Sequence, residues 1–516
     1  MALLEIDLWS SGYSVIMDNF VGFVFVLQAC VWFFQFFEGK TIFITGATGF
    51  LAKIFVEKIL RIQPSVKKLF LLMRPSNSKS CSQRLYQEII DTELFKVLRE
   101  KWGASLSFLI SERVVAVPGD ISCENLGIQN SPLREQMWRE IDVVINSAAT
   151  TRFDERYDVA VDINVFGALH ILNFAKNCVN IKVLLHISTA FVCSEEEGLA
   201  SEKPFDMRET LGGVSSYLDI NIEKKFVDER LRELQNENAR TEAIRSAMKD
   251  LGIQRARLHG WPNTYVFTKA MGEMVLEQFK EKLKVVIVRP TIVTSTFKDP
   301  FPGWIRGVRT IDSFLVAYGK GKLKFVLGDP KSILDLIPGD MVVNCILVAI
   351  VAHADQSYGH HIYHVGSSRR NPLKFSDVHE MFLSYFIKNP WVNDRGKPVR
   401  VNKCKVLSSM DSFNKYIATR YLPFLKILKL ANTLSCHHFE ATYIGAKRKV
   451  NLVTRLAEMY GRYVFSKVIF DDTNTQKLQV MAGEVDAEMF NFDPRSIQWK
   501  DYLMNIHIPG AIKHLF

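Results

Sequence analysis

Two side chains in the middle of the chain have the spacing and chemistry of a proton donor and its activator. Tyr265 and Lys269 form a Y-x-x-x-K motif, and this spacing puts them one turn apart on the same face of a helix. A lysine ammonium beside a phenol favours the phenolate and lowers the pKa of the tyrosine. Tyr265 is therefore predicted to donate a proton to an oxygen that gains negative charge during a reduction.

A hydroxyl group at the end of a preceding strand is expected to complete this site. The apolar run that ends at Ile187 is followed by Ser188 and Thr189. Thr189 matches the position best, with Ser188 as the neighbouring candidate, and the hydroxyl would stabilise charge on a carbonyl oxygen. Because Tyr265 lies 76 positions after Thr189, the insertion between them is expected to form a roof over a large substrate.

A glycine motif near the start of the chain predicts where a coenzyme binds. It follows an apolar run that reads as a strand, and it opens a helix. Gly46 permits a tight turn, and Gly49 lets backbone N–H groups approach a pyrophosphate at the positive end of the helix dipole. Thr48, Phe50 and Leu51 complete the part of the loop expected to contact a dinucleotide. The spacing G-x-x-G-x-x-A resembles the variant of this motif found in extended short-chain dehydrogenases.

Residues at the ends of later strands indicate which dinucleotide is bound. NAD enzymes usually place an Asp or Glu at the end of the second strand, whereas this chain has Arg74 there, which can pair with a ribose 2′-phosphate. NADPH is therefore the predicted cofactor. Asp120, with Ile121 beside it, is expected to accept a hydrogen bond from the adenine amino group. Ala148 and Ala149 are small enough for the backbone to approach the coenzyme.

The order of apolar segments predicts the fold. Short apolar runs alternate with helical segments up to about residue 370, and helical patterns dominate afterwards. We predict an α/β fold with a doubly wound parallel (Rossmann) sheet and a mainly helical C-terminal domain. The expected divisions are an N-terminal extension (1–38), a coenzyme-binding catalytic domain (39–370) and a C-terminal domain (371–516). The predicted strands are 41–45, 68–73, 113–117, 142–145, 183–187, 284–288 and 361–365.

Composition limits the functional class. The chain has 516 residues, with 65 Lys and Arg against 55 Asp and Glu. The basic residues are scattered and their tightest run, 447–449, has no interleaved aromatic residues, so we expect no nucleic-acid partner. The eight cysteines are widely spaced without a C-x-x-C pair, which favours a reducing, cytosol-facing compartment. The clusters Cys436-His437-His438 and His360-His361-His364 lack the spaced carboxylate and second ligand group of a zinc site, so no metal is predicted.

The N-terminal segment 20–37 is apolar apart from Gly22, Gln28 and Gln35. Its eighteen residues are at the lower limit for a helix that spans a membrane. Acidic residues precede it and no Lys or Arg does, which argues against a signal or transit peptide. Two interpretations stay open: a membrane anchor or interfacial helix, and a helix that packs on the catalytic domain.

Several segments resemble the alcohol-forming fatty acyl-CoA reductases, and most closely their plant members. The resemblance covers residues 38 to 516, and the shared segments lie in both the coenzyme-binding part and the C-terminal part. These segments are 40–53 around the glycine motif, 153–157 (FDERY), 259–269 (HGWPNTYVFTK), 300–305 (PFPGWI), 470–475 (FDDTNT) and 492–494 (FDP).

The resemblance implies a reduction in two steps. NADPH would reduce a long-chain fatty acyl-CoA to an aldehyde and then to a primary alcohol, in wax, suberin, cutin or pollen-wall lipid synthesis. Tyr265 would protonate the oxygen in each step, helped by Lys269 and Thr189, and Tyr265 and Lys269 would also contact the coenzyme. The C-terminal domain is expected to enclose an apolar channel that retains the aldehyde.

Long acyl thioesters partition to membranes, and residues 422–430 form another apolar, lysine-bearing segment. We therefore expect membrane association on the cytosol-facing side of the endoplasmic reticulum, with the plastid as the alternative.

Two other functions are compatible with these residues. A dehydrogenase of the same fold that acts on a nucleotide sugar or hydroxysteroid would use Thr189, Tyr265 and Lys269 equally well, but the long C-terminal domain and the segment 300–304 argue against it. A non-catalytic lipid-binding derivative would not need the three side chains intact. The sequence leaves acyl chain length, the choice between coenzyme A and acyl carrier protein, and the oligomeric state open.

Overall fold

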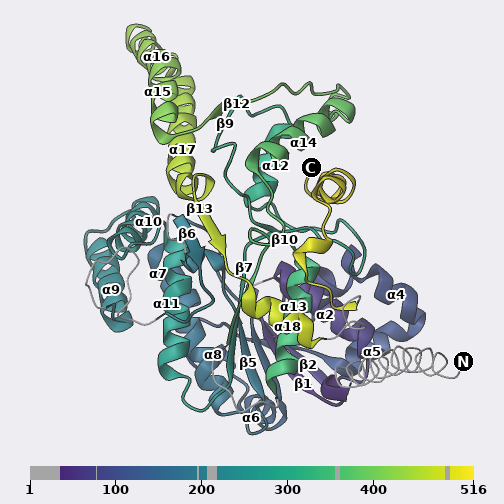
Figure 1. The fold of residues 1–516 in the computed structure, drawn as a ribbon. Coiled ribbons are helices and arrows are strands. Elements are labelled where there is room, and N and C mark those ends of the chain that lie inside the picture. The colour runs from purple at the N-terminus through teal and green to yellow at the C-terminus, as the bar shows by residue number, and fades with distance from the viewer. Residues whose placement is uncertain (1–34, 77, 194–196, 206–217, 355–360, 483–488) are drawn as a thin grey trace, which may run out of the picture.

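A sheet of seven parallel strands forms the centre of the computed structural model, which describes residues 35–76, 78–193, 197–205, 218–354, 361–482 and 489–516 (Figure 1). The strand order is β11-β7-β5-β4-β1-β2-β3. The chain builds one half of the sheet from β1 outward and then returns to build the other half from β4, which is a doubly wound topology. The strands are β1 (Thr41–Thr45), β2 (Lys68–Met73), β3 (Val114–Pro118), β4 (Val143–Asn146), β5 (Val183–Ile187), β7 (Val285–Pro290) and β11 (His361–Val365).

The predicted fold and its seven strands are confirmed, with bounds that agree to within two residues. These strands are rich in β-branched and aliphatic residues, and all except the edge strand β3 are almost entirely buried, as parallel strands under helices are. In β1, for example, Ile42 and Ile44 enter the core on one side of the sheet, and Phe43 enters the core on the other side.

Helices cover both faces of this sheet. The helices α2 (Phe50–Ile62) and α13 (Gly339–Ala354) share one core with Ile42, and α13 is buried along its whole length. The helices α6 (Ser131–Glu140), α8 (Gly167–Lys176) and α11 (Thr264–Phe279) share the opposite core with Phe43. Smaller helices flank the sheet: α3 (Cys81–Leu85), α4 (Lys96–Trp102), α5 (Leu106–Arg113) and α7 (Tyr157–Ala160).

One helical segment of the described residues, Tyr157–Lys176, is long and apolar enough to cross a membrane, and 61% of its apolar window is buried inside the protein. It runs from α7 through a π-helical turn into α8 and contributes to two cores, so it is an interior helix. The apolar N-terminal segment predicted over 20–37 lies outside the described residues except for 35–37. Phe37 is buried in the core that contains α2.

The insertion between β5 and α11 lies beside the sheet (Figure 1). It contains β6 (Glu197–Ala200) and the helices α9 (Ile220–Asn236) and α10 (Thr241–Leu258). The helix α10 packs against α7 and α11, and α9 packs against α7 and α10.

The region after residue 371 is mainly helical, as predicted, but it also adds short strands to earlier parts of the chain. The strand β12 (Lys405–Leu407) pairs with β9 (Phe325–Leu327), and β13 (Lys467–Phe470) pairs with β6. A third short pair joins β8 (Ile292–Thr294) to β10 (Leu336–Pro338). The remaining helices are α12 (Thr310–Gly319), α14 (Phe375–Lys388), α15 (Met410–Arg420), α16 (Leu422–Leu434), α17 (Glu440–Val464), α18 (Thr473–Met481), α20 (Trp499–Asp501) and α21 (Ile508–Leu515).

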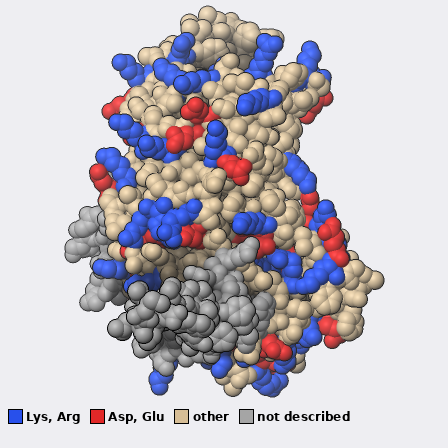
Figure 2. Space-filling view, turned by 45° about the vertical axis from the view of Figure 1, so that its right-hand side comes forward, with Lys and Arg blue, Asp and Glu red and all other residues tan. Residues whose placement is uncertain are grey.

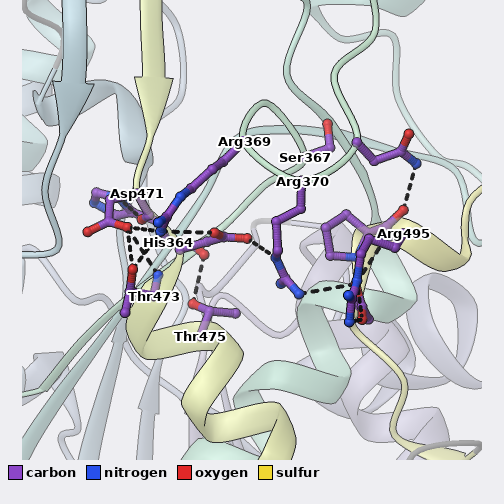
Figure 3. Close-up of polar contacts among 12 residues, drawn as sticks. His364, Ser367, Arg369, Arg370, Asp471, Thr473, Thr475 and Arg495 are labelled. Atoms are coloured by element: carbon purple, nitrogen blue, oxygen red, sulfur yellow. Dashed lines mark hydrogen bonds and ion pairs between the residues drawn. The ribbon is translucent and has the colours of Figure 1, made fainter.

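Polar contacts fasten the last part of the chain to the loop after β11 (Figure 3). Arg370 Nε lies 2.5 Å from Asp472 Oδ2, and Arg370 Nη1 lies 3.1 Å from Asp493 Oδ1. The Thr475 hydroxyl donates a hydrogen bond of 2.7 Å to the carbonyl oxygen of His364. Two of the segments that carry the resemblance thus connect the C-terminal end of the chain to the edge of the central sheet.

Candidate active site

The loop after β1 turns sharply at Gly46, where φ is +66°. A Cβ atom on Gly46 would lie 2.7 Å from the backbone nitrogen of Ala148, so only glycine fits both the left-handed backbone and the contact with the loop after β4. Gly49 immediately precedes α2, and a Cβ atom there would lie 2.9 Å from the carbonyl oxygen of Gly46. The two glycines therefore bring the N-terminus of α2 close to the carboxyl ends of β1 and β4.

A cavity of about 200 Å³ lies at the carboxyl ends of β1, β2, β3 and β4. This is the place where the strand order reverses, at which doubly wound folds bind nucleotides. The end of β2 and the two predicted coenzyme loops add Leu72, Met73, Gly119 and Ser147 to its lining, and Arg84 and Ile163, which the sequence analysis missed, line it too. Eight predicted coenzyme contacts line it as well: Gly46, Thr48, Gly49, Arg74, Asp120, Ile121, Ala148 and Ala149.

Phe50 and Leu51, which were also expected to contact the coenzyme, do not line this cavity. The buried Phe50 ring stacks on Trp304 at a centroid distance of 5.1 Å, and the guanidinium group of Arg309 lies over it at 4.1 Å. Leu51 packs against the core shared with α13. The two side chains therefore anchor the first turn of α2, and the predicted contact of these residues with the coenzyme stays a prediction.

Two guanidinium groups reach the cavity from the region after β2. Arg74 directly follows the strand, and Arg84 belongs to α3. Arg84 Nη1 donates a hydrogen bond of 2.5 Å to the carbonyl oxygen of Arg74, and Arg84 Nε lies 2.7 Å from Glu88 Oε1. The sequence analysis missed Arg84 because it lies ten residues beyond Arg74 on a helix that turns back. The capping box formed by Ser80 and Gln83 was the available signal for that helix.

The structure brings Thr189 and Tyr265 together. Tyr265 lies in the first turn of α11, whose N-cap Asn263 accepts a hydrogen bond from the backbone of Val266. Burial raises the pKa of Tyr265 to about 12, and a hydrogen bond with the Thr189 side chain acts in the opposite direction. The hydroxyl of the neighbouring Ser188 is buried without a hydrogen-bond partner among the described residues. The geometry therefore favours Thr189 over Ser188 as the partner of the phenol.

Lys269 is buried on α11 one turn after Tyr265. Its Nζ donates a hydrogen bond of 2.7 Å to the carbonyl oxygen of Ile187 and lies 3.0 Å from His186 Nε2. Burial lowers the pKa of Lys269 to about 8, while the Glu273 carboxylate acts in the opposite direction. The expected lowering of the Tyr265 pKa by Lys269 is wrong for this structure, because burial dominates at the phenol and the amine is held at the end of β5.

A buried chain of hydrogen bonds connects Lys269 to the glycine loop. His186 Nδ1 lies 2.9 Å from Asn146 Nδ2, and Asn146 Oδ1 accepts a hydrogen bond of 2.7 Å from the Thr45 hydroxyl. The Thr45 oxygen in turn accepts a hydrogen bond of 3.1 Å from the backbone of Ala148. The sequence analysis assigned no role to His186 or Asn146. The sequence feature that could have indicated a role for them is a polar side chain inside an apolar, buried strand.

Aromatic side chains cover Tyr265 on its outer side. The Phe153 ring stacks on Tyr265 with 6.0 Å between centroids and an interplanar angle of 8°. Tyr460 and Tyr463, near the end of α17, pack on Phe153 at centroid distances of 5.0 and 5.3 Å. Tyr463 also accepts a hydrogen bond of 2.6 Å from Asn263 Nδ2. We call Phe153, Tyr460 and Tyr463 the aromatic wall. The wall makes the surroundings of the phenol apolar and ties it to the C-terminal region.

A buried ion pair supports α11 from the side of the sheet. Arg289 on β7 and Glu273 on α11 lie 2.5 Å apart, with both side chains almost fully buried. The pair fixes α11, and with it Tyr265 and Lys269, against the sheet. Across the described ranges, no group of three or more His, Cys, Asp or Glu side chains is placed to hold a metal ion.

Comparisons with known proteins identify relatives over almost the whole chain. Two family models described as male sterility protein match residues 44–346 and 420–516. An alcohol-forming fatty acyl-CoA reductase from Simmondsia chinensis is 52% identical over 484 residues, which are 93% of this chain and 98% of that protein. Fatty acyl-CoA reductase 1 from Arabidopsis thaliana is 51% identical over 485 residues, again 93% of this chain and 98% of that protein.

A solved structure shows the same fold. The reductase domain of a non-ribosomal peptide synthetase from Mycobacterium tuberculosis covers 93% of this chain and 92% of its own chain, with a TM-score of 0.55 at 16% identity. The first family model describes an NAD-binding domain, and its range contains the cavity beside the glycine loop. The chain therefore takes a nicotinamide coenzyme. The chain is an oxidoreductase and belongs to the fatty acyl-CoA reductase family.

Proposed function

We propose that this protein reduces long-chain fatty acyl-CoA to a primary alcohol through an aldehyde, with NADPH as the reductant. The observation that carries the proposal is the contact of Thr189 with Tyr265 under an aromatic wall, with Lys269 one turn later on the same helix and connected through His186 to the loops that line the cavity. Relatives named fatty acyl-CoA reductases support the choice of substrate. The Simmondsia relative, named as alcohol-forming, supports the choice of product.

When bound, the coenzyme supplies one hydride in each of two rounds. In the first round, hydride and a proton add to the thioester carbonyl, and the resulting hemithioacetal releases coenzyme A as the thiol and leaves the aldehyde. In the second round, hydride and a proton convert the aldehyde to the alcohol. Each acyl-CoA thus consumes two NADPH and two protons.

The protein's own groups act at the carbonyl oxygen. Tyr265 donates the proton, and the Thr189 hydroxyl hydrogen-bonds to the same oxygen as negative charge develops on it. The buried Lys269, one helical turn after Tyr265, holds the end of β5 by donating a hydrogen bond to the carbonyl oxygen of Ile187. The aromatic wall excludes water from the reacting carbonyl. It also keeps the aldehyde from escaping between rounds.

Arg74 and Arg84 support NADPH in preference to NADH. Both side chains line the cavity at the end of β2, where an NAD enzyme would have an acidic group. Guanidinium groups bind phosphate oxygens in a planar, bidentate manner, so two of them make a site suited to a 2′-phosphate.

Product analysis tests the proposed reaction. Purified protein is incubated with NADPH and a panel of saturated acyl-CoAs of increasing chain length, and each component is omitted in turn as a control. A primary alcohol with two NADPH consumed per molecule is expected. Aldehyde as the only product would contradict the second reduction, and no product from any thioester would move the assignment to a nucleotide-sugar or hydroxysteroid substrate.

We propose the cytosolic face of the endoplasmic reticulum as the location of the enzyme, with the plastid as the alternative. Acyl-CoA and its alcohol product partition into bilayers, which favours an enzyme at a membrane surface. A C-terminal fluorescent fusion, imaged with markers for both organelles, tests the location. A signal confined to the plastid would select the alternative, and one spread through the cytosol would contradict both.

A further inference from the structure

Three helices of the C-terminal region form an arm that rises from the body of the protein (Figure 1). The helices α15 and α16 run up the arm, and α17 returns along them. A turn around Cys436 joins α16 to α17 and forms the tip. We call residues 410–464 the arm.

The outer face of α16 is an apolar stripe. Phe424, Ile427, Leu430 and Leu434 follow helical spacing and are 54%, 68%, 60% and 77% exposed. The opposite side of α16 packs within the arm, where Asn432 is buried. Four large apolar side chains are thus exposed on one face of the helix. Contact of such a patch with water is unfavourable, which marks it as an interaction surface.

Positive charge surrounds this stripe. The arm contains nine Lys or Arg and three Asp or Glu, and Lys426 and Lys429 on α16 flank the stripe itself. Figure 2 shows an uncharged cap at the top of the molecule, with Lys and Arg side chains gathered below it. An apolar stripe edged by lysines fits the boundary between the acyl chains and the acidic headgroups of a bilayer.

We propose that the arm docks on the surface of a bilayer containing acidic phospholipid. The stripe enters the headgroup region, and Lys426, Lys429 and the other basic side chains of the arm contact lipid phosphates. A second copy of the chain is a poorer occupant of the stripe, because two arms of the same positive charge repel each other.

The arm connects this docking surface to the candidate active site. The end of α17 opposite the tip carries Tyr460 and Tyr463 of the aromatic wall. A cleft of about 780 Å³ between the arm and α10 is lined by Leu422 at the start of α16 and by Pro262, two residues before α11. When the arm is docked, this cleft lies where an acyl chain leaves the bilayer. This consequence rests on the proposed function.

Two exposed cysteines make a matched test of the docking surface. Cys436 lies at the tip and Cys123 lies on the body, and the other described cysteines are buried. An environment-sensitive thiol fluorophore is attached to one of these cysteines at a time. Cys436 is labelled in a variant with Cys30→Ser and Cys123→Ser, and Cys123 is labelled in a variant with Cys30→Ser and Cys436→Ser. Each full-length protein is mixed with phosphatidylcholine vesicles, with and without phosphatidylserine.

A blue shift of the probe at Cys436 and none at Cys123 is expected, with phosphatidylserine-containing vesicles only. Combined Lys426→Glu and Lys429→Glu substitutions should weaken vesicle binding by about tenfold or more. Ile427→Asp with Leu430→Asp should abolish the shift, whereas Val179→Asp, at a residue that is 77% exposed elsewhere on the surface, should leave it unchanged.

Several results would overturn the proposal. These are vesicle binding without a shift at Cys436, an equal shift at both cysteines, and a shift at Cys436 that depends on protein concentration without lipid. The last result would identify a second copy of the chain as the occupant. The fluorescence readout needs no turnover, so failure of docking can be distinguished from failure of the proposed reaction. The reaction is followed separately, with the same variants and a short, soluble acyl-CoA.

Discussion

In the proposed reaction, the phenol of Tyr265 contributes a proton and little binding energy. Its ring stacks on Phe153 and its hydroxyl interacts with Thr189. Tyr265→Phe preserves the ring and removes only the proton donor. Turnover should therefore fall by about 10² or more with little change in the dissociation constant of NADPH. Steady-state rates and coenzyme titration by fluorescence check both parts, and near-normal turnover would remove Tyr265 from the chemistry.

The lowered pKa of Lys269 predicts a pH dependence for the proposed reaction. The titratable groups around it are Glu273, one turn later on the same helix, and His186 on β5. Burial lowers the pKa of Lys269 to about 8, so the ammonium form is present below pH 8 and is lost as the pH rises through that value. If the ammonium supports proton donation by Tyr265, the reduction rate is constant below about pH 8 and falls above it.

Lys269→Arg is the control for this pH profile. Arginine keeps its charge throughout the range, so the alkaline fall should disappear or move to higher pH even if the maximal rate drops. The pH dependence of kcat for both proteins, measured with a thioester that is stable over the range, provides the check. The same alkaline limb in the variant would assign the titration to another group.

At the scale of an element, the proposed preference for NADPH depends on the loop and helix after β2. Arg74 and Arg84 line the same cavity although one follows a strand and the other belongs to α3. Arg74→Glu or Arg84→Glu should weaken NADPH by about tenfold or more through charge repulsion and leave NADH nearly unchanged. Dissociation constants for both coenzymes test this. Arg230→Glu, on α9 outside the cavity, is the matched charge reversal, and an equal loss in that variant would contradict the assignment.

The contact between α17 and the start of α11 couples the C-terminal region to the site. Asn263 caps α11 through Val266 and donates a hydrogen bond to Tyr463. Tyr463→Phe removes the acceptor of a buried donor, which should cost about 1 kcal/mol of unfolding free energy. Asn263→Ser keeps a capping hydroxyl and loses the same contact. A double-mutant cycle by urea denaturation should show the two effects to be non-additive; full additivity would mean that the hydrogen bond adds no stability.

The central elements were predictable from the sequence because their signals are local. Each strand of the sheet is a short, buried apolar run bounded by turns, and the glycine loop and the Y-x-x-x-K helix have fixed spacings. The pairing of β13 with β6 had no such signal, since each strand has four residues and its partner lies far away in the sequence. Arg84, His186 and the aromatic wall were missed for the same reason: their roles depend on which distant segments meet.

At the scale of the whole molecule, the proposed C-terminal domain is closely joined to the catalytic part. The division between residues 370 and 371 stays a prediction. The residue on each side of it forms ion pairs or hydrogen bonds with the last part of the chain. Arg370 pairs with Asp472 and Asp493, and Asn371 donates hydrogen bonds of 2.7 and 2.8 Å to the carbonyl oxygens of Pro494 and Ile497. The end of the chain therefore contributes to the stability of the sheet that carries the site.

Arg370 offers a direct test of this connection. Its partner Asp472 is 3% exposed, so Arg370→Met leaves a buried carboxylate without its main counter-charge. The free energy of unfolding should fall by about 3 kcal/mol, the cost typical of breaking a buried ion pair by removing one partner. Arg495→Met is the matched control, because Arg495 also pairs with Asp493 but its side chain is 62% exposed, where ion pairs contribute little. Urea denaturation followed by fluorescence should show one transition for both variants, with only Arg370→Met shifted. A separate early transition in Arg370→Met would instead mean that the C-terminal region unfolds as an independent unit.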